Sequence, residues 1–371
     1  MRVLHFFKAA MPDSMGGIEQ VMHQLSMGAQ KHGIDSDVLA LTRGEPRVIE
    51  QDGYRVHLVK SSFELASTGF SVDAFKTFAR LAKHADVVHY QYPWPLMDLV
   101  HFVTRCNKPS VVSYQSDIVR QKRLLQLYRP LQQRFLRSVD KLVVASPNYL
   151  ASSTELEPFR AKTCVIPIGL DRASYPPADA QRNANWRRQL GERFFLFVGV
   201  LRYYKGLHVL IEAARGSRYP IVIVGAGPVE QDLKAQAQQL GVSNIHFLGA
   251  LPEHDKVALL ELCTALVFPS HLRSEAFGIS LLEGAMFGKP MISCEIGTGT
   301  TYINIDRETG LVVPPDNPPA LRAAMDWLWN NPDDAAQMGV RAAQRYEQLF
   351  TAERMVAEYV QLYRQLVEQR N

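Results

Sequence analysis

The sequence predicts an α/β protein built from two doubly wound parallel sheets, and three observations lead to this fold class. Short apolar, β-rich runs alternate with helix-period segments in the first half of the chain. The alternation restarts after residues 166–177, a segment that carries proline and glycine. The length of 371 residues suits two domains of about 100–200 residues each. We therefore expect two domains that face each other across a cleft.

Seven strands are expected in the first half, with helices between several of them. The strands are residues 3–7, 37–41, 56–59, 87–90, 110–113, 142–145 and 163–166. Residues 18–28 and 74–81 show helical spacing of apolar side chains. This order predicts βα units and hence a parallel sheet.

Six further strands are expected after the join. They are residues 194–200, 221–224, 245–248, 266–269, 291–294 and 311–313. Residues 352–369 form a helical pattern beyond the second sheet, and we expect this helix to pack back on the first domain. The expected division is therefore residues 1–170 with 350–371, and residues 171–349.

Composition excludes several classes of protein. Hydrophobic residues make up 47% and charged residues 21%, which argues against disorder or a fibrous chain. The four cysteines are scattered without a CxxC pair, so neither a zinc site nor a disulfide framework is expected. The N-terminus does not resemble a signal peptide, and no apolar run reaches the ~18–20 residues of a membrane span. A net charge of +4 does not indicate nucleic acid, and we expect a cytoplasmic protein.

The strongest local signal is the segment Ser-Glu-Ala-Phe-Gly-Ile-Ser-Leu-Leu-Glu at residues 274–283. A helix is expected from Phe277 or Gly278 up to Gly288, because a glycine followed by Lys-Pro is typical of a helix end. Free amides at the helix start suit a phosphate. Glu275 and Glu283 suit sugar or ribose hydroxyls. The spacing alone is equally consistent with an amphipathic helix that carries solvated glutamates.

Two other strand-end loops carry residues suited to an anion. Arg202 and Lys205 follow the strand at 194–200, and a guanidinium with an ammonium suits a diphosphate. Gly16 and Gly17 lie between the first strand and its helix, where paired glycines allow close backbone approach. Taken singly, an ordinary solvated loop and an empty turn explain these two segments at least as well.

Taken together and in order, these motifs resemble the retaining glycosyltransferases of family 4. Gly16-Gly17, the Ile-Pro-Ile-Gly-Leu-Asp hinge at residues 166–171, Arg202 with Lys205, and Glu275 with Glu283 cover essentially the whole chain. The Glu-x7-Glu element is the most specific of them. The resemblance implies the GT-B fold of two Rossmann-like domains. It is strongest with bacterial O-antigen mannosyl- and rhamnosyltransferases.

The resemblance also implies site residues. Catalytic roles would fall to Glu275, Gln115, Arg202 and Lys205. The nucleotide-sugar donor would be held by Gly16, Gly17, Gly199, Arg202, Lys205, Gly225, Ala250, Leu251, Glu275, Phe277, Gly278, Ile279, Leu282 and Glu283. Neither a metal nor a cofactor is implied, because two cations and a helix end would neutralise the diphosphate.

Gln115 departs from the family pattern. Members of the family usually carry a histidine after the strand that here ends near Ser113. Glutamine can orient a sugar hydroxyl but does not titrate near neutral pH. Two expectations stay open: that the leaving phosphate serves as the base, or that activity is reduced.

Two weaker motifs favour no separate function. Asp35-Ser-Asp37 matches the metal-binding DxD of another glycosyltransferase fold, but polar residues are ordinary at a strand entry. Residues 224–230 begin like the GxGxxG motif but carry Glu230 where the last glycine is expected. This departure argues against the alternative that the protein is a dinucleotide-dependent oxidoreductase. A sugar-nucleotide-binding protein without turnover is the other alternative, and Gln115 supports it.

Residues 120–137 carry six basic side chains and no acid, with an apolar side. Pro130 is expected to kink or divide this helix. A helix of this kind can lie on an anionic membrane, although a solvated cationic face explains it equally well. Residues 116–122 look like transferases that use GDP-mannose or GDP-rhamnose, with UDP-glucose or UDP-N-acetylglucosamine as the alternative. The expected acceptor is a lipid-linked oligosaccharide at the inner face of the plasma membrane.

Overall fold

A computed structural model describes residues 1–65, 68–118, 122–177 and 179–370, with backbone only at residues 64–65, 68 and 122–125. The chain divides into two compact units. Unit 1 comprises Met1–Leu170 with Ala352–Asn371, and unit 2 comprises Asp171–Thr351. The borders expected from the sequence are 170/171 and 349/350.

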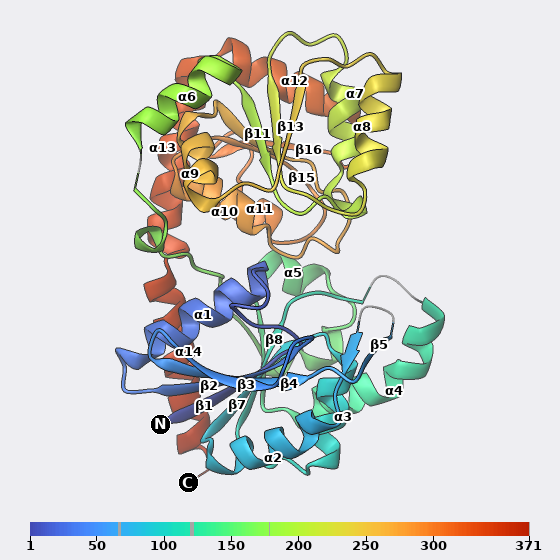
Figure 1. The fold of residues 1–371 in the computed structure, drawn as a ribbon, viewed down its shortest axis with the longest axis vertical. Coiled ribbons are helices and arrows are strands. Elements are labelled where there is room, and N and C mark those ends of the chain that lie inside the picture. The colour runs from blue at the N-terminus through green and yellow to red at the C-terminus, as the bar shows by residue number, and fades with distance from the viewer. Residues whose placement is uncertain (66–67, 119–121, 178, 371) are drawn as a thin grey trace. The chain divides into compact units, whose positions relative to one another are not determined.

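The sheet of unit 1 has eight strands in the order β10-β9-β8-β7-β1-β2-β4-β3 (Figure 1). Their bounds are β1 Arg2–Phe6, β2 Asp35–Thr42, β3 Arg47–Gln51, β4 Tyr54–Lys60, β7 Val87–Tyr92, β8 Ser110–Tyr114, β9 Lys141–Val144 and β10 Thr163–Val165. Every pairing is parallel except that of β3 with β4. The order reverses at β1, so the loops after β1 and β7 leave the sheet at a topological switch point, where ligands bind in such folds.

The sequence missed β3 and the hairpin of β5 (Phe63–Leu65) and β6 (Thr68–Phe70). The side chains of β3 are mostly exposed, because it is an edge strand, so no buried apolar run marks it. The seven expected strands are all present within one or two residues at each end.

The described part of unit 1 contains six α-helices. They are α1 Gly17–Gln30, α2 Asp73–His84, α3 Pro95–Val103, α4 Lys122–Ser138, α5 Pro147–Ser152 and α14 Ala352–Glu368. Of the two expectations for Pro130, a kink or a division of the helix, division is wrong, because α4 continues through it. Pro130 and Gln126, whose carbonyl loses its partner, are both exposed, so water can satisfy that carbonyl.

The C-terminal helix α14 is part of the core of unit 1. It lies beside α1 (Figure 1), and a Cβ on Gly28 would come within 2.6 Å of Val356. The Tyr359 hydroxyl lies 2.7 Å from Ser113 Oγ on β8, and the Tyr363 hydroxyl lies 2.7 Å from His89 Nδ1 on β7. The helix therefore belongs to the first unit although it follows the second in sequence.

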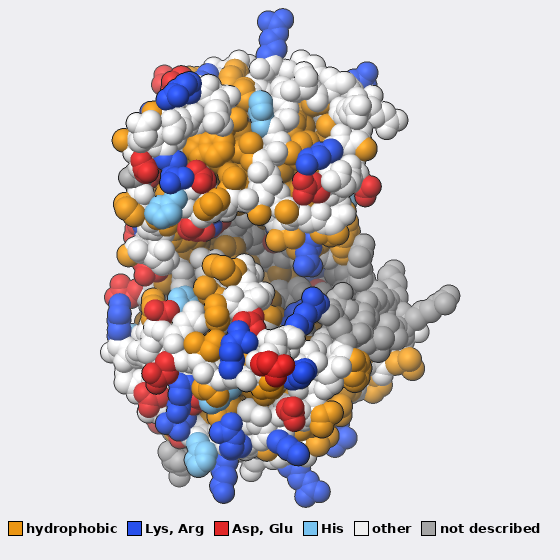
Figure 2. All heavy atoms as spheres, in the orientation of Figure 1, with side chains coloured by type: hydrophobic (Ala, Val, Ile, Leu, Met, Phe, Trp, Pro, Cys, Tyr) orange, Lys and Arg blue, Asp and Glu red, His pale blue; other side chains and the backbone are white. Residues whose placement is uncertain are grey.

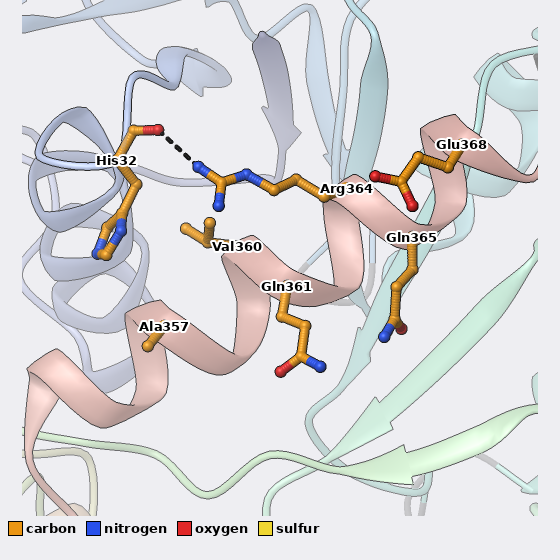
Figure 3. Close-up of a pocket in the computed structure, with 7 residues that line it drawn as sticks. All are labelled: His32, Ala357, Val360, Gln361, Arg364, Gln365 and Glu368. Atoms are coloured by element: carbon orange, nitrogen blue, oxygen red, sulfur yellow. Dashed lines mark hydrogen bonds between the residues drawn. The ribbon is translucent and has the colours of Figure 1, made fainter.

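One hollow of unit 1 lies along this contact and is shown in Figure 3. Its walls come from α14 and from His32 at the end of α1, and Arg364 donates a hydrogen bond of 3.0 Å to the His32 carbonyl. None of the candidate site residues lines it, so we assign it to the anchoring of α14.

Unit 2 has a six-stranded, fully parallel sheet in the order β13-β12-β11-β14-β15-β16. The strands are β11 Phe195–Val198, β12 Ile221–Val224, β13 Ile245–Gly249, β14 Ala265–Phe268, β15 Met291–Cys294 and β16 Gly310–Val313. All six were expected. The order reverses between the neighbours β11 and β14, so the loops after these two strands meet at the switch point.

Eight α-helices in the described part of unit 2 cover this sheet. They are α6 Ala180–Leu190, α7 Leu207–Ala214, α8 Glu230–Gln239, α9 Glu253–Leu262, α10 Ile279–Met286, α11 Thr300–Ile303, α12 Pro318–Asn330 and α13 Pro332–Leu349. Helices α7 and α8 lie on one side of the sheet, and α9 and α10 lie on the other (Figure 1). Right-handed crossovers that change direction at the switch point require this two-sided cover.

Candidate active site

The loop between β11 and α7 carries the two candidate cations. Arg202 is exposed, whereas Lys205 is buried in the short 3-10 turn Tyr203–Lys205. Gly206 ends this turn with φ at 68°, and a Cβ there would lie 1.9 Å from the Pro269 carbonyl oxygen. The loops after β11 and β14 are thus pressed together, and only glycine fits between them.

Lys205 and Glu275 form a buried ion pair at this contact. The Lys205 ammonium lies 2.5 Å from Glu275 Oε2, and the Ser270 hydroxyl donates to the same oxygen at 3.1 Å. The ammonium also lies 4.7 Å from the centroid of the Phe268 ring. Only 8% of Glu275 is exposed, so the alternative of a solvated glutamate is wrong at this position.

The start of α10 offers free backbone donors. Gly278 caps the helix with φ at 100°, and no side chain occupies the cap. The first hydrogen bond within the helix runs from the Leu282 amide to the Gly278 carbonyl, at 3.2 Å. The amides before Leu282, among them that of Ile279, therefore point out of the helix without an intrahelical acceptor, at its positive end.

Glu283 lies on α10 and is 4% exposed. Its Oε1 accepts hydrogen bonds from the Lys256 ammonium at 2.7 Å and from the Tyr175 hydroxyl at 3.0 Å. Burial alone would lower the pKa of Lys256, but the carboxylates of Glu283 and Glu253 outweigh it and raise that pKa. Glu283 is therefore an ordered carboxylate, not a solvated one.

Glycines hold the ends of β11, β12 and β13 together. A Cβ on Gly225 would lie 2.0 Å from the Gly199 carbonyl oxygen, and the Gly225 amide donates to the Gly249 carbonyl at 2.7 Å. The turn that begins like GxGxxG is therefore explained by packing of strand ends. Ala250, next along the chain, is exposed, and Leu251 is half-buried.

Two expected donor residues have buried apolar side chains. Leu282 is fully buried, and Phe277 is packed against Gly299, whose Cβ would lie 2.5 Å from its ring. Because these two side chains are apolar and packed in the core, Phe277 and Leu282 offer hydrogen-bonding groups to a ligand only through the backbone. Their side chains support the loop and helix that carry Glu275 and Glu283.

In unit 1, Gly16 and Gly17 open α1. The carboxylate of Glu19 folds back over the helix start, so that a Cβ on Gly16 would lie 2.5 Å from Glu19 Oε2. The Ser14 hydroxyl donates to the other oxygen of Glu19 at 2.7 Å. The glycines thus leave room for a local carboxylate at the positive end of the helix.

Gln115 follows β8 and is half-buried. Its Nε2 donates to Gln91 Oε1 at 2.8 Å, and Gln91 in turn lies 3.4 Å from His89 Nε2. Burial lowers the pKa of His89 well below its usual value, and the neighbouring His5 adds to this shift. This hydrogen bond, from which the amide orientation is assigned, occupies the amide nitrogen of Gln115 and leaves its oxygen as the atom that could accept from a ligand.

Asp35 and Asp37 have no role in this site. Asp37 is buried and accepts from His57 at 2.8 Å, with Arg55 3.1 Å away. Although burial opposes it, these partners lower the pKa of Asp37. Asp37 therefore joins β2 to β4, which is a structural role.

The sequence missed four supporting residues: Lys256, Tyr175, Ser270 and Gln91. Lys256 lies one helix away from Glu283, and Tyr175 is separated from it by more than 100 positions. No local pattern connects them. Tyr175 lies within the segment 166–177 that the sequence predicts as the hinge, and this position is the one signal that could have drawn attention to it.

The fold and the strand-end site define a two-domain glycosyltransferase of the GT-B type. The chain matches the family described as "Glycosyl transferases group 1" over residues 180–345 and "Glycosyltransferase Family 4" over residues 15–174. The chain therefore belongs to the family 4 glycosyltransferases, with a group 1 glycosyl transferase region in its second half, and is a glycosyltransferase.

Two curated relatives support the assignment over nearly the whole chain. The D-rhamnosyltransferase WbpZ of Pseudomonas aeruginosa is 60% identical over 95% of this chain and 93% of its own. The O-antigen chain mannosyltransferase C of Escherichia coli is 50% identical over the full length of both.

Solved structures share the fold. Sucrose-phosphate synthase from Thermosynechococcus elongatus superposes with a TM-score of 0.81 at 21% identity, covering 99% of each chain. Anabaena HepE, solved with UDP and glucose, gives 0.79 at 18% identity over 97% of this chain and 98% of its own. At such identities the likeness carries the fold alone.

Proposed function

We propose that this glycosyltransferase transfers mannose or rhamnose from a GDP-sugar, with retention of configuration, to a lipid-linked oligosaccharide in O-antigen assembly. The buried Lys205–Glu275 pair beside the open start of α10 carries the proposal, because it combines a cation, a hydroxyl acceptor and free amides at one switch point. The names of the two full-length relatives favour the sugar and the pathway.

In this proposal the diphosphate lies on the start of α10. Exposed Arg202 and buried Lys205 offer positive charge from the neighbouring loop, and the amides near Ile279 donate to phosphate oxygens. Stabilising the departing diphosphate in this way lowers the barrier to cleavage of the sugar–phosphate bond. No metal or other cofactor enters the proposed reaction.

Glu275 and Glu283 would receive hydroxyl groups. Glu275 Oε2 is already shared by Lys205 and Ser270, which leaves its other oxygen for the donor sugar. Likewise, Glu283 Oε1 is taken by Lys256 and Tyr175, and its second oxygen can accept from the ribose. Gly199, Gly225, Ala250 and Leu251 would border the base. Gly16, Gly17 and Gln115 in unit 1 would contact the diphosphate or the acceptor.

The membrane part of the proposal depends on α4. No helix in the described part of the chain is long and apolar enough to span a bilayer, so we propose a peripheral association. Arg120 lies outside the described residues, as do the side chains of Lys122 and Arg123. Of the other basic residues, Arg129 pairs with Glu155 at 2.9 Å and Arg134 lies over the Phe102 ring.

A donor panel tests the proposal. The protein is incubated with GDP-mannose, GDP-rhamnose, UDP-glucose or UDP-N-acetylglucosamine and a lipid-linked oligosaccharide acceptor, and nucleotide release and product are measured. We expect release of GDP and an elongated acceptor with the anomeric configuration of the donor. Turnover of UDP-sugars alone would reject the donor assignment. Binding without turnover of any donor would favour a catalytically weak sugar-nucleotide-binding protein.

A further inference from the structure

Three side chains that are not among the candidate donor-binding residues converge at one place in unit 2. His208 lies on α7, His271 in the loop after β14, and Asp316 in the turn between β16 and α12. One ligand atom from each lies within 4.8 Å of the other two. The two imidazole rings are 5.0 Å apart, and His208 Nε2 lies 3.9 Å from Asp316 Oδ1.

The hydrogen bonds of His271 define which of its ring atoms is available. Its Nε2 lies 3.1 Å from the Tyr203 carbonyl oxygen, which accepts only, so this nitrogen carries a proton. In the neutral ring, Nδ1 then holds a lone pair and faces Asp316 Oδ1. Two acceptors that face each other in this way need a cation between them, either a proton or a metal ion.

The backbone at Asp316 orients its carboxylate toward the two histidines. Asp316 has φ at 52°, a left-handed conformation that is uncommon for a residue with a side chain. Held in this way, its carboxylate reaches both His208 and His271. Exposed Asp52 has a similar φ of 46°, so the argument for a site rests on the meeting of the three side chains and not on this backbone conformation.

We propose that His208, His271 and Asp316 bind a divalent transition metal ion of the zinc class. Two imidazoles and one carboxylate form an established zinc ligand set, with water in the fourth position. Ligand atoms in a tetrahedral zinc site lie about 3.3 Å apart at bond lengths near 2.0 Å, so small side-chain rotations close this cluster around an ion. The Tyr203 carbonyl completes the arrangement, because a metal-bound histidine commonly donates its second N–H to a backbone carbonyl.

This ion would act on the loop that carries the donor cations. His271 holds Tyr203 through its side chain, and its own amide donates to the Tyr204 carbonyl at 3.0 Å. Arg202 and Tyr203 line the same hollow, of about 360 Å³, as His208 and His271. The metal therefore cross-links α7, the loop after β14 and the turn before α12 around the turn Tyr203–Lys205. Its role is structural and lies outside the proposed catalytic chemistry.

Cobalt(II) is the probe for the test, because its visible absorption reports coordination. Untagged full-length protein, stripped with a chelator, is titrated with Co²⁺ and then with Zn²⁺ in competition, and thermal unfolding is followed in parallel. We expect one equivalent of each ion to bind, with four- or five-coordinate Co²⁺ bands, and a rise of the unfolding midpoint on addition of Zn²⁺.

Matched variants locate the site. His208→Gln and Asp316→Asn should each weaken Co²⁺ binding at least ten-fold, and neither side chain touches the Tyr203 carbonyl. His254→Gln, at an exposed histidine elsewhere in unit 2, should bind as the parent does. Binding that survives both substitutions, Co²⁺ spectra with thiolate charge-transfer bands, or no binding at all would overturn the proposal. The last result would mean that a proton alone joins His271 to Asp316.

Discussion

At the scale of single residues, Lys256 determines whether Glu283 can remain an ionised, buried carboxylate. The ammonium supplies the only charge that the structure places within hydrogen-bond reach of Glu283 among the described residues. Replacing Lys256 by Met leaves that carboxylate with Tyr175 alone. Removing one partner of a buried pair is costly, because the other charge stays desolvated.

We therefore expect Lys256→Met to lower the free energy of unfolding by about 2–3 kcal/mol. This cost is smaller than that of breaking a fully buried ion pair, because Lys256 keeps some exposure. The KM for the donor should rise more than kcat falls. Lys234→Met is the control, since its pair with Glu230 is an exposed one, worth about 0.5 kcal/mol or less. Denaturant unfolding measures both variants. Glu283→Gln removes the carboxylate charge that Lys256→Met leaves unpaired. If the double variant is no more stable than Lys256→Met, an unpaired buried charge is not the cause of the loss.

Gln115 is the second residue with a separable role. If it only orients a hydroxyl, Gln115→Ala should lower kcat/KM about ten-fold, which corresponds to one hydrogen bond of about 1.4 kcal/mol. Gln115→His should not exceed the parent, because Gln91 is placed to hold an amide. Steady-state kinetics with the best donor of the panel measure both. A large gain in Gln115→His would instead mean that glutamine impairs the reaction.

At the scale of secondary-structure elements, the contact between the loops after β11 and β14 depends on Gly206. Alanine there would meet both a left-handed backbone and the Pro269 carbonyl, whereas Gly216 has a similar φ of 72° with nothing within 4 Å. The pair of glycines thus separates backbone strain from steric conflict.

We expect Gly216→Ala to cost about 1 kcal/mol of unfolding free energy and Gly206→Ala at least about 3 kcal/mol. Gly206→Ala should also weaken donor binding, because Lys205 moves with its turn. Thermal unfolding and donor titration measure the two effects. Equal costs for the two substitutions would mean that the loops after β11 and β14 separate easily.

Helix α4 is the element that should meet a membrane. Phe135 and Leu136, at the C-terminal end of α4, are buried in unit 1. Leu127, nearer the start of the helix, is 81% exposed and presents an apolar side chain to the surroundings. On the face drawn in Figure 2, Lys and Arg side chains lie among Asp and Glu side chains.

We expect the protein to float with anionic vesicles at low salt and to be released at high salt, because exposed charges are screened. Leu127→Glu should reduce flotation several-fold without loss of stability, since the side chain is exposed. Neutral vesicles serve as the control. Absence of flotation with anionic vesicles at low salt would end the membrane proposal.

At the scale of the whole molecule, buried histidines make unit 1 sensitive to acid. Burial lowers the pKa of His5 to about 4, and burial lowers that of His101 to about 4 as well, against an opposing effect of Asp140. Between pH 6.5 and 4, these two imidazoles therefore bind protons in the unfolded chain but stay neutral in the folded chain. The contribution of these two neutral histidines to the free energy of unfolding is therefore fully present above pH 6.5 and is lost as the pH falls toward 4.

Each histidine should contribute a slope of about 1.4 kcal/mol per pH unit in this window. His5→Phe should make the pH dependence of unfolding shallower by about that amount, since neither ring nitrogen of His5 has a hydrogen-bond partner in the described structure. His32→Gln, at an exposed position, is the control. Unfolding midpoints from pH 7 to pH 4.5 decide the matter, and parallel curves for parent and His5→Phe would contradict the assignment.

The sequence by itself determined the two doubly wound sheets and the loops that carry the site. Each buried parallel strand is a continuous apolar run, which sequence periodicity registers directly. Edge strand β3 escaped because exposure removes that signal. The motif order around Arg202, Lys205, Glu275 and Glu283 also sufficed to indicate the family, because these residues lie in fixed positions after particular strands.

Only the tertiary structure decided how these residues are held. Whether a glutamate is solvated or buried depends on side chains from distant elements, such as Lys256 and Tyr175 around Glu283. The same holds for the hydrogen bond of Gln115 to Gln91 and for the meeting of His208, His271 and Asp316. Such contacts arise where the sheet order brings loops together, and no spacing along the chain encodes them.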